Sequence, residues 1–155
     1  MTIDQRLASL GIELPPVPVP AASYVPARRA GNLVFSSGQT PTRDGQLLMA
    51  GKLGRELSIE QGQEAARLAT LNCLAALRQE LGTLDAIQDI IKVTGFVASA
   101  EGFGDQPQVI NGASLLLEQV FESRGRHARS ALGLAELPFG APVEVELIVA
   151  VKPGQ

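Results

Sequence analysis

The stretch from residue 143 to 151, Val-Glu-Val-Glu-Leu-Ile-Val-Ala-Val, limits the fold more than any other part of this chain. Side chains of a strand alternate between two faces, so the odd-numbered apolar positions of this stretch share one face. Glu144 and Glu146 fall on the other face. Because an unpaired buried carboxylate is costly, these glutamates require water, a cation or a proton. The stretch therefore predicts a strand with one core face and one polar face.

A second strand is predicted just before this one, with Arg129 near its start. Residues 137–142 contain Pro and Gly breakers and join the two strands, so a hairpin-like return would bring Arg129 close to a glutamate of the next strand. A guanidinium binds a carboxylate ligand bidentately, and a neighbouring glutamate can act as a general base for water. An Arg–Glu ion pair that only locks the two strands together is the alternative.

Two long helices are predicted from their capping residues and apolar periodicity. A capping box that opens at Ser58 predicts a helix over residues 59–81, with a broad apolar arc that indicates cover on more than one side. Asp105 as N-cap, followed by Pro107, predicts a second helix that ends near Glu122.

The other apolar runs predict strands. Gly31-Asn32 is typical of a short hairpin between residues 25–30 and 33–37, and the β-branched run 90–99 predicts a buried strand. Helices between strands that also form hairpins indicate an α+β class, with one mostly antiparallel sheet and two helices packed on one face. The other face would be bare in one copy, which favours self-association.

The length of 155 residues predicts a single domain over residues 1–155. Residues 1–23 are predicted to form a short N-terminal helix, capped by Thr2, and a proline-rich strap that starts near Leu14. The core of the domain is then expected over residues 24–152.

Composition excludes several functions. The net charge of −3 argues against a nucleic-acid partner, and a single histidine beside a single cysteine argues against a transition-metal site. The cysteine, Cys73, lies in an apolar helical pattern and is expected to be a reduced core thiol. A Ser–His–Asp device would need His127, and no serine is paired with it in the sequence. No apolar run approaches the ~20 residues of a membrane span, and the N-terminal residues lack the charged region followed by an apolar region that is typical of a signal peptide. A cytoplasmic location without membrane contact is therefore expected.

Several motifs occur in a fixed order along the chain. They are Tyr24 seven residues before Gly31-Asn32, then Ser37-Gly38-Gln39, Asp89-Ile90-Ile91-Lys92-Val93-Thr94, Ala128-Arg129-Ser130, Leu137-Pro138 and Val143-Glu144-Val145-Glu146. In this order, and with fifteen positions from Arg129 to Glu144, they resemble the Rid family of reactive intermediate deaminases. That family is also called the YjgF or L-PSP endoribonuclease family.

The resemblance implies a chorismate mutase-like fold that forms a homotrimer with a central barrel and ligand clefts between subunits. It also implies a hydrolase of the 2-iminobutanoate/2-iminopropanoate deaminase type, which converts 2-aminoacrylate and 2-imino acids to 2-oxo acids and ammonia. Arg129 would hold the substrate carboxylate and Glu144 would position water. Ser37 and Tyr24 would line the cleft, and Asn111 is the counterpart of an asparagine in the second helix of active members. No cofactor or metal is implied, because the imine is already electrophilic.

Three departures indicate a divergent branch of that family: the additional residues 1–23, His127 where the family commonly has proline, and Ala131 where many members have cysteine or threonine. They leave open a non-catalytic trimer that binds a small 2-oxo or amino acid. An endoribonuclease is the second alternative, and the acidic balance and scarcity of aromatic residues argue against it.

Overall fold

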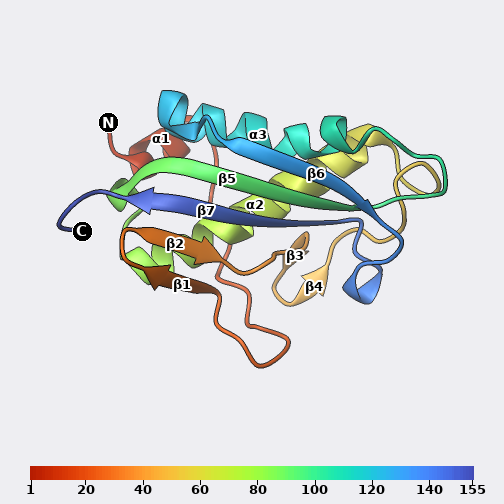
Figure 1. The fold of residues 1–155 in the computed structure, drawn as a ribbon, viewed down its shortest axis with the longest axis horizontal. Helices are drawn as coiled ribbons and strands as arrows, with labels where there is room; N and C mark the ends of the chain where they lie inside the picture. The colour runs from red at the N-terminus through yellow and green to blue at the C-terminus, as the bar shows by residue number, and fades with distance from the viewer.

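A five-stranded sheet forms the centre of the computed structural model, which describes residues 1–155 (Figure 1). The strands of this sheet are β1 (Ala27–Ala30), β2 (Leu33–Ser36), β5 (Ile87–Ala98), β6 (Ala128–Leu134) and β7 (Val143–Val151). They lie in the spatial order β1-β2-β7-β5-β6, and every neighbouring pair is antiparallel except the parallel pair of β5 and β6. A separate two-stranded ladder joins β3 (Thr42–Arg43) and β4 (Gln46–Leu47).

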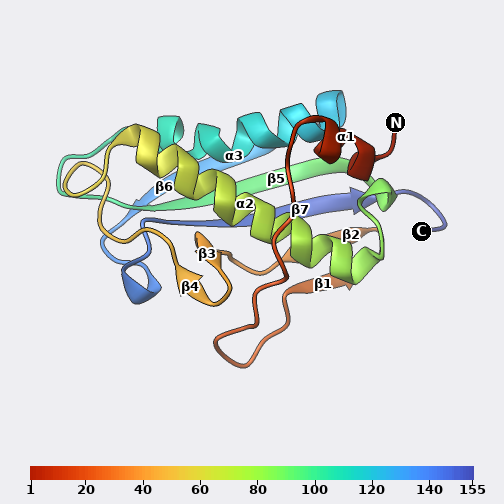
Figure 2. The ribbon, with the colours of Figure 1, turned by 180° about the vertical axis from the view of Figure 1, so that it is seen from behind.

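Two long helices, α2 (Ile59–Leu81) and α3 (Gln106–Phe121), cover one face of the sheet, as Figure 2 shows from the helix side. The capping box of Ser58 is present, and Gly82 ends α2 in a left-handed conformation with φ of 80°. The predicted span 59–81 is confirmed. Asp105 precedes α3 as predicted, although its side chain makes no capping hydrogen bond. No helix is both long and apolar enough to cross a membrane.

A third helix, α1 (Ile3–Ser9), begins at the predicted capping box of Thr2 and packs against the end of α3. Its residues Ile3 and Leu7 are buried in the core. The guanidinium of Arg6 donates to the carbonyl of Gln119 at 2.9 Å, so α1 contacts α3 through polar as well as apolar groups. Three single-turn helices complete the chain: η1 (Leu84–Ala86), η2 (Glu122–Gly125) and η3 (Pro138–Gly140).

The alternation of buried and half-buried side chains along β7 shows which face of the sheet the helices cover. The odd-numbered residues from Val143 to Val151 are at most 1% exposed and pack under the helices, whereas Glu144 and Glu146 are half-buried on the opposite face. That opposite face has no helix over it, and it carries Phe35 at 41% and Leu132 at 48% exposure. The predicted α+β architecture, with a mostly antiparallel sheet and both long helices on one face, is confirmed.

The predicted hairpin-like return from β6 to β7 is wrong. Strand β5 lies between these two strands, parallel to β6 and antiparallel to β7. The chain passes the end of β5 through η3, where Phe139 adopts a left-handed conformation with φ of 61°. A breaker-rich segment predicts a turn but does not say whether the strands it joins are neighbours.

The helices α2 and α3 approach closely at Gly112. A Cβ atom on this residue would overlap the carbonyl oxygen of Gln63 on α2. The amide of Gln63 also donates to the carbonyl of Gln108 on α3 at 2.9 Å. Glycine is therefore required here by helix packing, because any larger residue would push the two helices apart.

Candidate functional site

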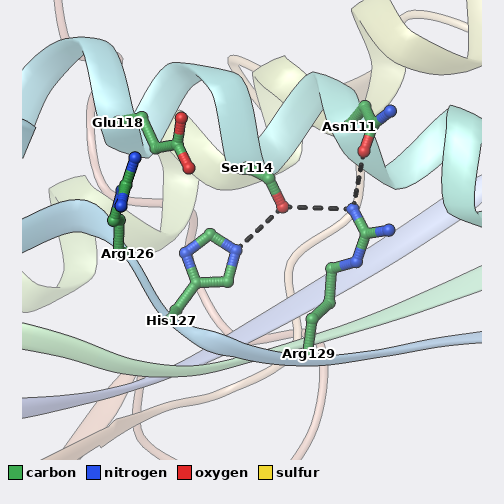
Figure 3. Close-up of a pocket in the computed structure, with 6 residues that line it drawn as sticks. All are labelled: Asn111, Ser114, Glu118, Arg126, His127 and Arg129. Atoms are coloured by element: carbon green, nitrogen blue, oxygen red, sulfur yellow. Dashed lines mark hydrogen bonds between the residues drawn. The ribbon is translucent and has the colours of Figure 1, made fainter.

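Arg129, the second residue of β6, points toward α3. It pairs with Val93 of β5, whose side chain is fully buried under the helices, and paired residues on neighbouring strands share a face. Its Nη1 atom donates to Oδ1 of Asn111 at 2.8 Å and to Oγ of Ser114 at 3.2 Å (Figure 3). The remaining guanidinium nitrogens, Nε and Nη2, make no hydrogen bond within the chain. One edge of the guanidinium is thus held by α3, while the other is free for a ligand.

Ser114 also contacts the single histidine of the chain. Its Oγ lies 2.8 Å from Nε2 of His127, and Nδ1 of His127 lies 2.6 Å from the carbonyl oxygen of Gly125. A carbonyl oxygen only accepts hydrogen bonds, so Nδ1 carries the ring hydrogen in the neutral imidazole. Nε2 is then an acceptor, and the hydroxyl of Ser114 donates to it.

The sequence-based inference that no serine accompanies His127 is wrong, because Ser114 lies thirteen residues before it and on a different element. A signal was available in the helix itself. Ser114 follows Asn111 by three positions, so both side chains lie on the same face of α3. Serine is so common on exposed helix faces that this spacing alone did not mark it as part of a site.

These residues line an open pocket of about 400 Å³ between α3 and the start of β6. It is lined only by polar or charged residues, which are Asn111, Ser114, Glu118, Arg126, His127 and Arg129. Figure 3 shows the three helix residues facing the other three along the groove. A pocket lined by no hydrophobic side chain and by two guanidinium groups suits a small, charged and hydrated ligand.

Glu144 lies on the opposite face of the sheet from this pocket. It pairs with Phe96 of β5, which is three positions from Val93, the partner of Arg129. Three positions along a regular strand reverse the face, so Arg129 and Glu144 cannot meet within one chain. The two residues that the sequence motifs single out therefore form one site only if a second copy supplies one of them.

The carboxyl of Glu144 sits against the segment that follows β2, at Gly38. A Cβ atom on Gly38 would lie 2.8 Å from Cδ of Glu144, so the glycine permits this close approach. Burial of the carboxyl, and secondarily the charge of Glu146, raise the pKa of Glu144 above its ordinary value. A carboxylate with a raised pKa is a stronger base than an exposed one.

Ser37 directly follows β2 and precedes Gly38, the glycine that packs against Glu144. The hydroxyl of Ser37 donates to the carbonyl of Val25 at 2.6 Å, which ties the strap that precedes β1 to the end of β2. Tyr24, the residue before Val25, is 49% exposed. The structure thus brings Arg129 together with Asn111 and places Ser37 near Glu144, whereas no side-chain hydrogen bond links Tyr24 to the other predicted site residues.

Cys73 is fully buried in α2, and its thiol contacts the carbonyl of Val145 at 3.1 Å. Burial raises the pKa of this thiol to about 12, so it is not a nucleophile at neutral pH. No group of three or more His, Cys, Asp or Glu side chains is placed to hold a metal ion.

Fold and site together define a small α+β protein of the chorismate mutase-like type, with an arginine-centred pocket at one edge of its sheet. The chain belongs to the Rid/YjgF family: residues 4–150 match the family model described as "YjgF/chorismate mutase-like, putative endoribonuclease". It is 44% identical to Protein TCP17 of Trypanosoma cruzi over 97% of this chain and 94% of that protein.

Two further relatives bear on the site. A crystal structure described as a putative endoribonuclease, from Shewanella oneidensis MR-1, superposes with a TM-score of 0.94 at 34% identity and covers 97% of this chain and all of that one. A 2-iminobutanoate/2-iminopropanoate deaminase of Dermatophagoides farinae is 28% identical over 91% of this chain and 95% of that protein.

Proposed function

We propose that this protein is a deaminase that hydrolyses small 2-imino acids, including those formed from 2-aminoacrylate, to 2-oxo acids and ammonia. The observation that carries the proposal is the geometry of Arg129. Its Nη1 is engaged by Asn111 and Ser114, whereas Nε and Nη2 are free and form the fork that binds a carboxylate bidentately. The name of the mite relative supports the same reaction class.

Glu144 supplies the base for this reaction. The oxygen of a water molecule adds to the imine carbon while a proton of the water passes to the carboxylate of Glu144. Glu144 passes this proton to the nitrogen, which gives a carbinolamine. The remaining hydroxyl proton then moves to the nitrogen through Glu144 as the carbon–oxygen double bond forms and the carbon–nitrogen bond breaks, so ammonia leaves a 2-oxo acid behind. No cofactor enters this sequence, because the imine carbon accepts the nucleophile directly.

The site is completed by a second copy of the chain, in a homotrimer whose sheets pack through their open faces into a central barrel. Support comes from the position of the two residues, since Arg129 and Glu144 point to opposite faces of one sheet. The exposed Phe35 and Leu132 on the open face support the same arrangement, because apolar side chains of this size favour burial against a partner.

The test is a coupled assay in which a serine or threonine dehydratase generates the imine in the presence of the purified protein. Release of 2-oxo acid should exceed the rate in buffer, and Arg129→Ala should reduce kcat/KM by about 100-fold or more, the effect expected for a lost charged, bidentate contact. Arg43→Ala, which removes an exposed arginine on β3, is the matched control and should behave as wild type.

Equal turnover by Arg129→Ala would overturn the proposal. A folded wild-type protein that accelerates nothing, yet is stabilised thermally by 2-oxo acids, would replace deamination with a ligand-binding role. The family description also names an endoribonuclease. RNA cleavage that survives Arg129→Ala while deamination is absent would favour that activity instead.

A further inference from the structure

The guanidinium of Arg129 is the end of a chain of hydrogen bonds that starts in the backbone. The carbonyl of Gly125 accepts from Nδ1 of His127, Nε2 of His127 accepts from the hydroxyl of Ser114, and Oγ of Ser114 accepts from Nη1 of Arg129. With the imidazole neutral, each step has one direction, because the first acceptor is a carbonyl and the last donor is a guanidinium, which cannot accept.

The first member of the chain is fixed in space. A Cβ atom on Gly125 would overlap the carbonyl oxygen of Leu117, so the backbone of Gly125 packs directly on α3. Gly125 itself is buried. Its carbonyl therefore presents a stable acceptor to His127, and this bond selects the ring tautomer in which Nε2 is free to accept.

Ser114 needs His127 to keep its orientation. A serine hydroxyl on a helix rotates freely and can donate to the carbonyl four residues earlier, as Thr70 does to Ala66 in α2. When the hydroxyl of Ser114 donates its hydrogen bond to Nε2 of His127, the lone pairs of Oγ remain available to accept from Nη1 of Arg129. Asn111 then provides the second acceptor for the same Nη1 atom.

We infer that His127 and Ser114 are positioning residues, which hold Arg129 in one rotamer with Nε and Nη2 turned toward the ligand. The inference rests on the proposed function, because Arg129 is the group that binds the substrate carboxylate there. Arginine is flexible, and ordering it before the ligand arrives removes an entropy cost from binding. Neither residue touches the reacting atoms in this scheme.

A Ser–His couple also resembles a nucleophile with its base, and the surroundings argue against that role here. The Oγ atom of Ser114 accepts a hydrogen bond from Arg129, which reduces its nucleophilicity. No hydrophobic side chain lines the pocket, so it offers no apolar subsite built for an acyl group. Covalent labelling of Ser114 by a fluorophosphonate would overturn the positioning role in favour of the nucleophile.

The first experiment needs no ligand. His127 is the only histidine in the chain, so the ¹⁵N signals of its ring are unambiguous and should show hydrogen on Nδ1 and none on Nε2. Relaxation of the Arg129 Nε–H group should report an ordered side chain in wild type and in Ser114→Thr, which keeps the hydroxyl. The side chain should be mobile in Ser114→Ala and in His127→Phe.

The second experiment measures binding of 2-oxobutanoate, a stable product of the proposed reaction, by calorimetry. Ser114→Ala should weaken binding about fivefold, the loss of one hydrogen bond, and Ser114→Thr should restore it. His127→Phe should weaken it by about twofold to fivefold for the same reason. Ser123→Ala, which removes an exposed serine of η2, is the matched control and should bind as wild type.

The two experiments separate this inference from the proposed function. Failure of the wild-type protein to bind 2-oxobutanoate would count against the proposed function, while the relaxation data would still decide whether His127 and Ser114 order Arg129. Hydrogen on Nε2 of His127, an Arg129 side chain that stays ordered in Ser114→Ala, or an unchanged Kd in that variant would each overturn the positioning role. In turnover, these variants should raise KM with little change in kcat, because they weaken binding of the carboxylate equally in the ground state and in the transition state.

Discussion

The two faces of the sheet differ in what completes them. On the helix-covered face, adjacent strands present side chains such as Val34 and Val149 that are fully buried by α2 and α3 of the same chain. On the open face, their neighbours Phe35 and Ile148 remain exposed or half-buried, and Glu144 and Glu146 pair with Phe96 and Thr94 of β5. The apolar side chains of the covered face are buried within one copy, whereas the open face leaves apolar side chains and carboxylates partly exposed.

The same division runs through the candidate site. Arg129 lies in the groove between α3 and β6, where hydrogen bonds link it to Asn111 and Ser114, and link Ser114 to His127. Glu144 is on the open face, beside Gly38, and no side chain of its own chain donates to it. In the proposed shared site, the ordered guanidinium of Arg129 from one copy would meet Glu144, a base with a raised pKa, from another copy.

The largest expected effect comes from placing one charge on either face. Val34→Asp would bury an unpaired carboxylate in the core, because Val34 is 0% exposed, and should destabilise the chain by about 4–5 kcal/mol or more. Phe35→Asp, at the next residue on the opposite face, should leave the fold of one copy intact and weaken association. Circular dichroism and sedimentation velocity distinguish the two outcomes, and equal loss of fold in both variants would remove the distinction between the faces.

The next effect tests whether the two faces share one active site. Arg129→Ala and Glu144→Gln should each lower kcat/KM by about 100-fold, since each removes a charged contact or the base. When both variants are co-expressed and mix at random, about a quarter of the sites should contain one intact arginine and one intact glutamate from neighbouring copies. Recovery of about a quarter of the wild-type activity is expected, and the absence of recovery in mixed oligomers would mean that each site uses a single chain.

On the covered face, the close approach of α2 and α3 at Gly112 predicts that alanine at this position destabilises the protein, although alanine has the higher helix propensity. Alanine is favoured over glycine in a helix by about 1 kcal/mol, yet a Cβ on Gly112 would overlap the carbonyl of Gln63. Gly112→Ala should therefore destabilise the protein by about 2–3 kcal/mol in denaturant unfolding. Gly104→Ala is the matched control, because nothing lies near that position, and its effect should be small.

The elements of this fold could be predicted because their signals are local. Capping residues such as Thr2 and Ser58 act on the first turn beside them, and the alternation of β7 follows from the geometry of one strand. The strand order is not local, because β5 enters between β6 and β7 from a distant part of the chain. The sequence therefore indicated the five strands of the main sheet and the hairpin of β1 and β2, and it failed on the neighbours of β6 and β7.

The candidate site divides in the same way. The family resemblance implied Arg129 and Asn111 as site residues, and in the structure Nη1 of Arg129 lies 2.8 Å from Oδ1 of Asn111. Ser114 and His127 were not linked by any motif, because their contact depends on the register between α3 and β6. That register is set by packing of the helix on the sheet, which has no signature in either segment alone.

The smallest expected effect concerns the charge of Glu144 on the open face. Burial, and then the charge of Glu146, raise its pKa in the folded chain, so the folded state holds this proton more tightly than the unfolded state does. The stabilising contribution of protonated Glu144 is fully present below the unfolded pKa, near 4.3, and is lost as the pH rises through the higher folded value. Glu144→Gln stays neutral, so it should be more stable than wild type at pH 7, and the difference should shrink toward pH 4.

Denaturant unfolding of the two proteins between pH 4 and 7 measures this difference, and Phe35→Asp in both backgrounds keeps each chain in the same state of association. In a Glu146→Gln background the pH-dependent difference should be smaller but still present, because burial is the larger cause of the shift and the neighbouring charge the lesser one. A difference that is constant across this pH range would show that Glu144 is as well solvated as in the unfolded chain. The carboxylates of the open face would then be fully solvated, and the contrast between the two faces would rest on the exposed apolar side chains of Phe35 and Leu132 alone.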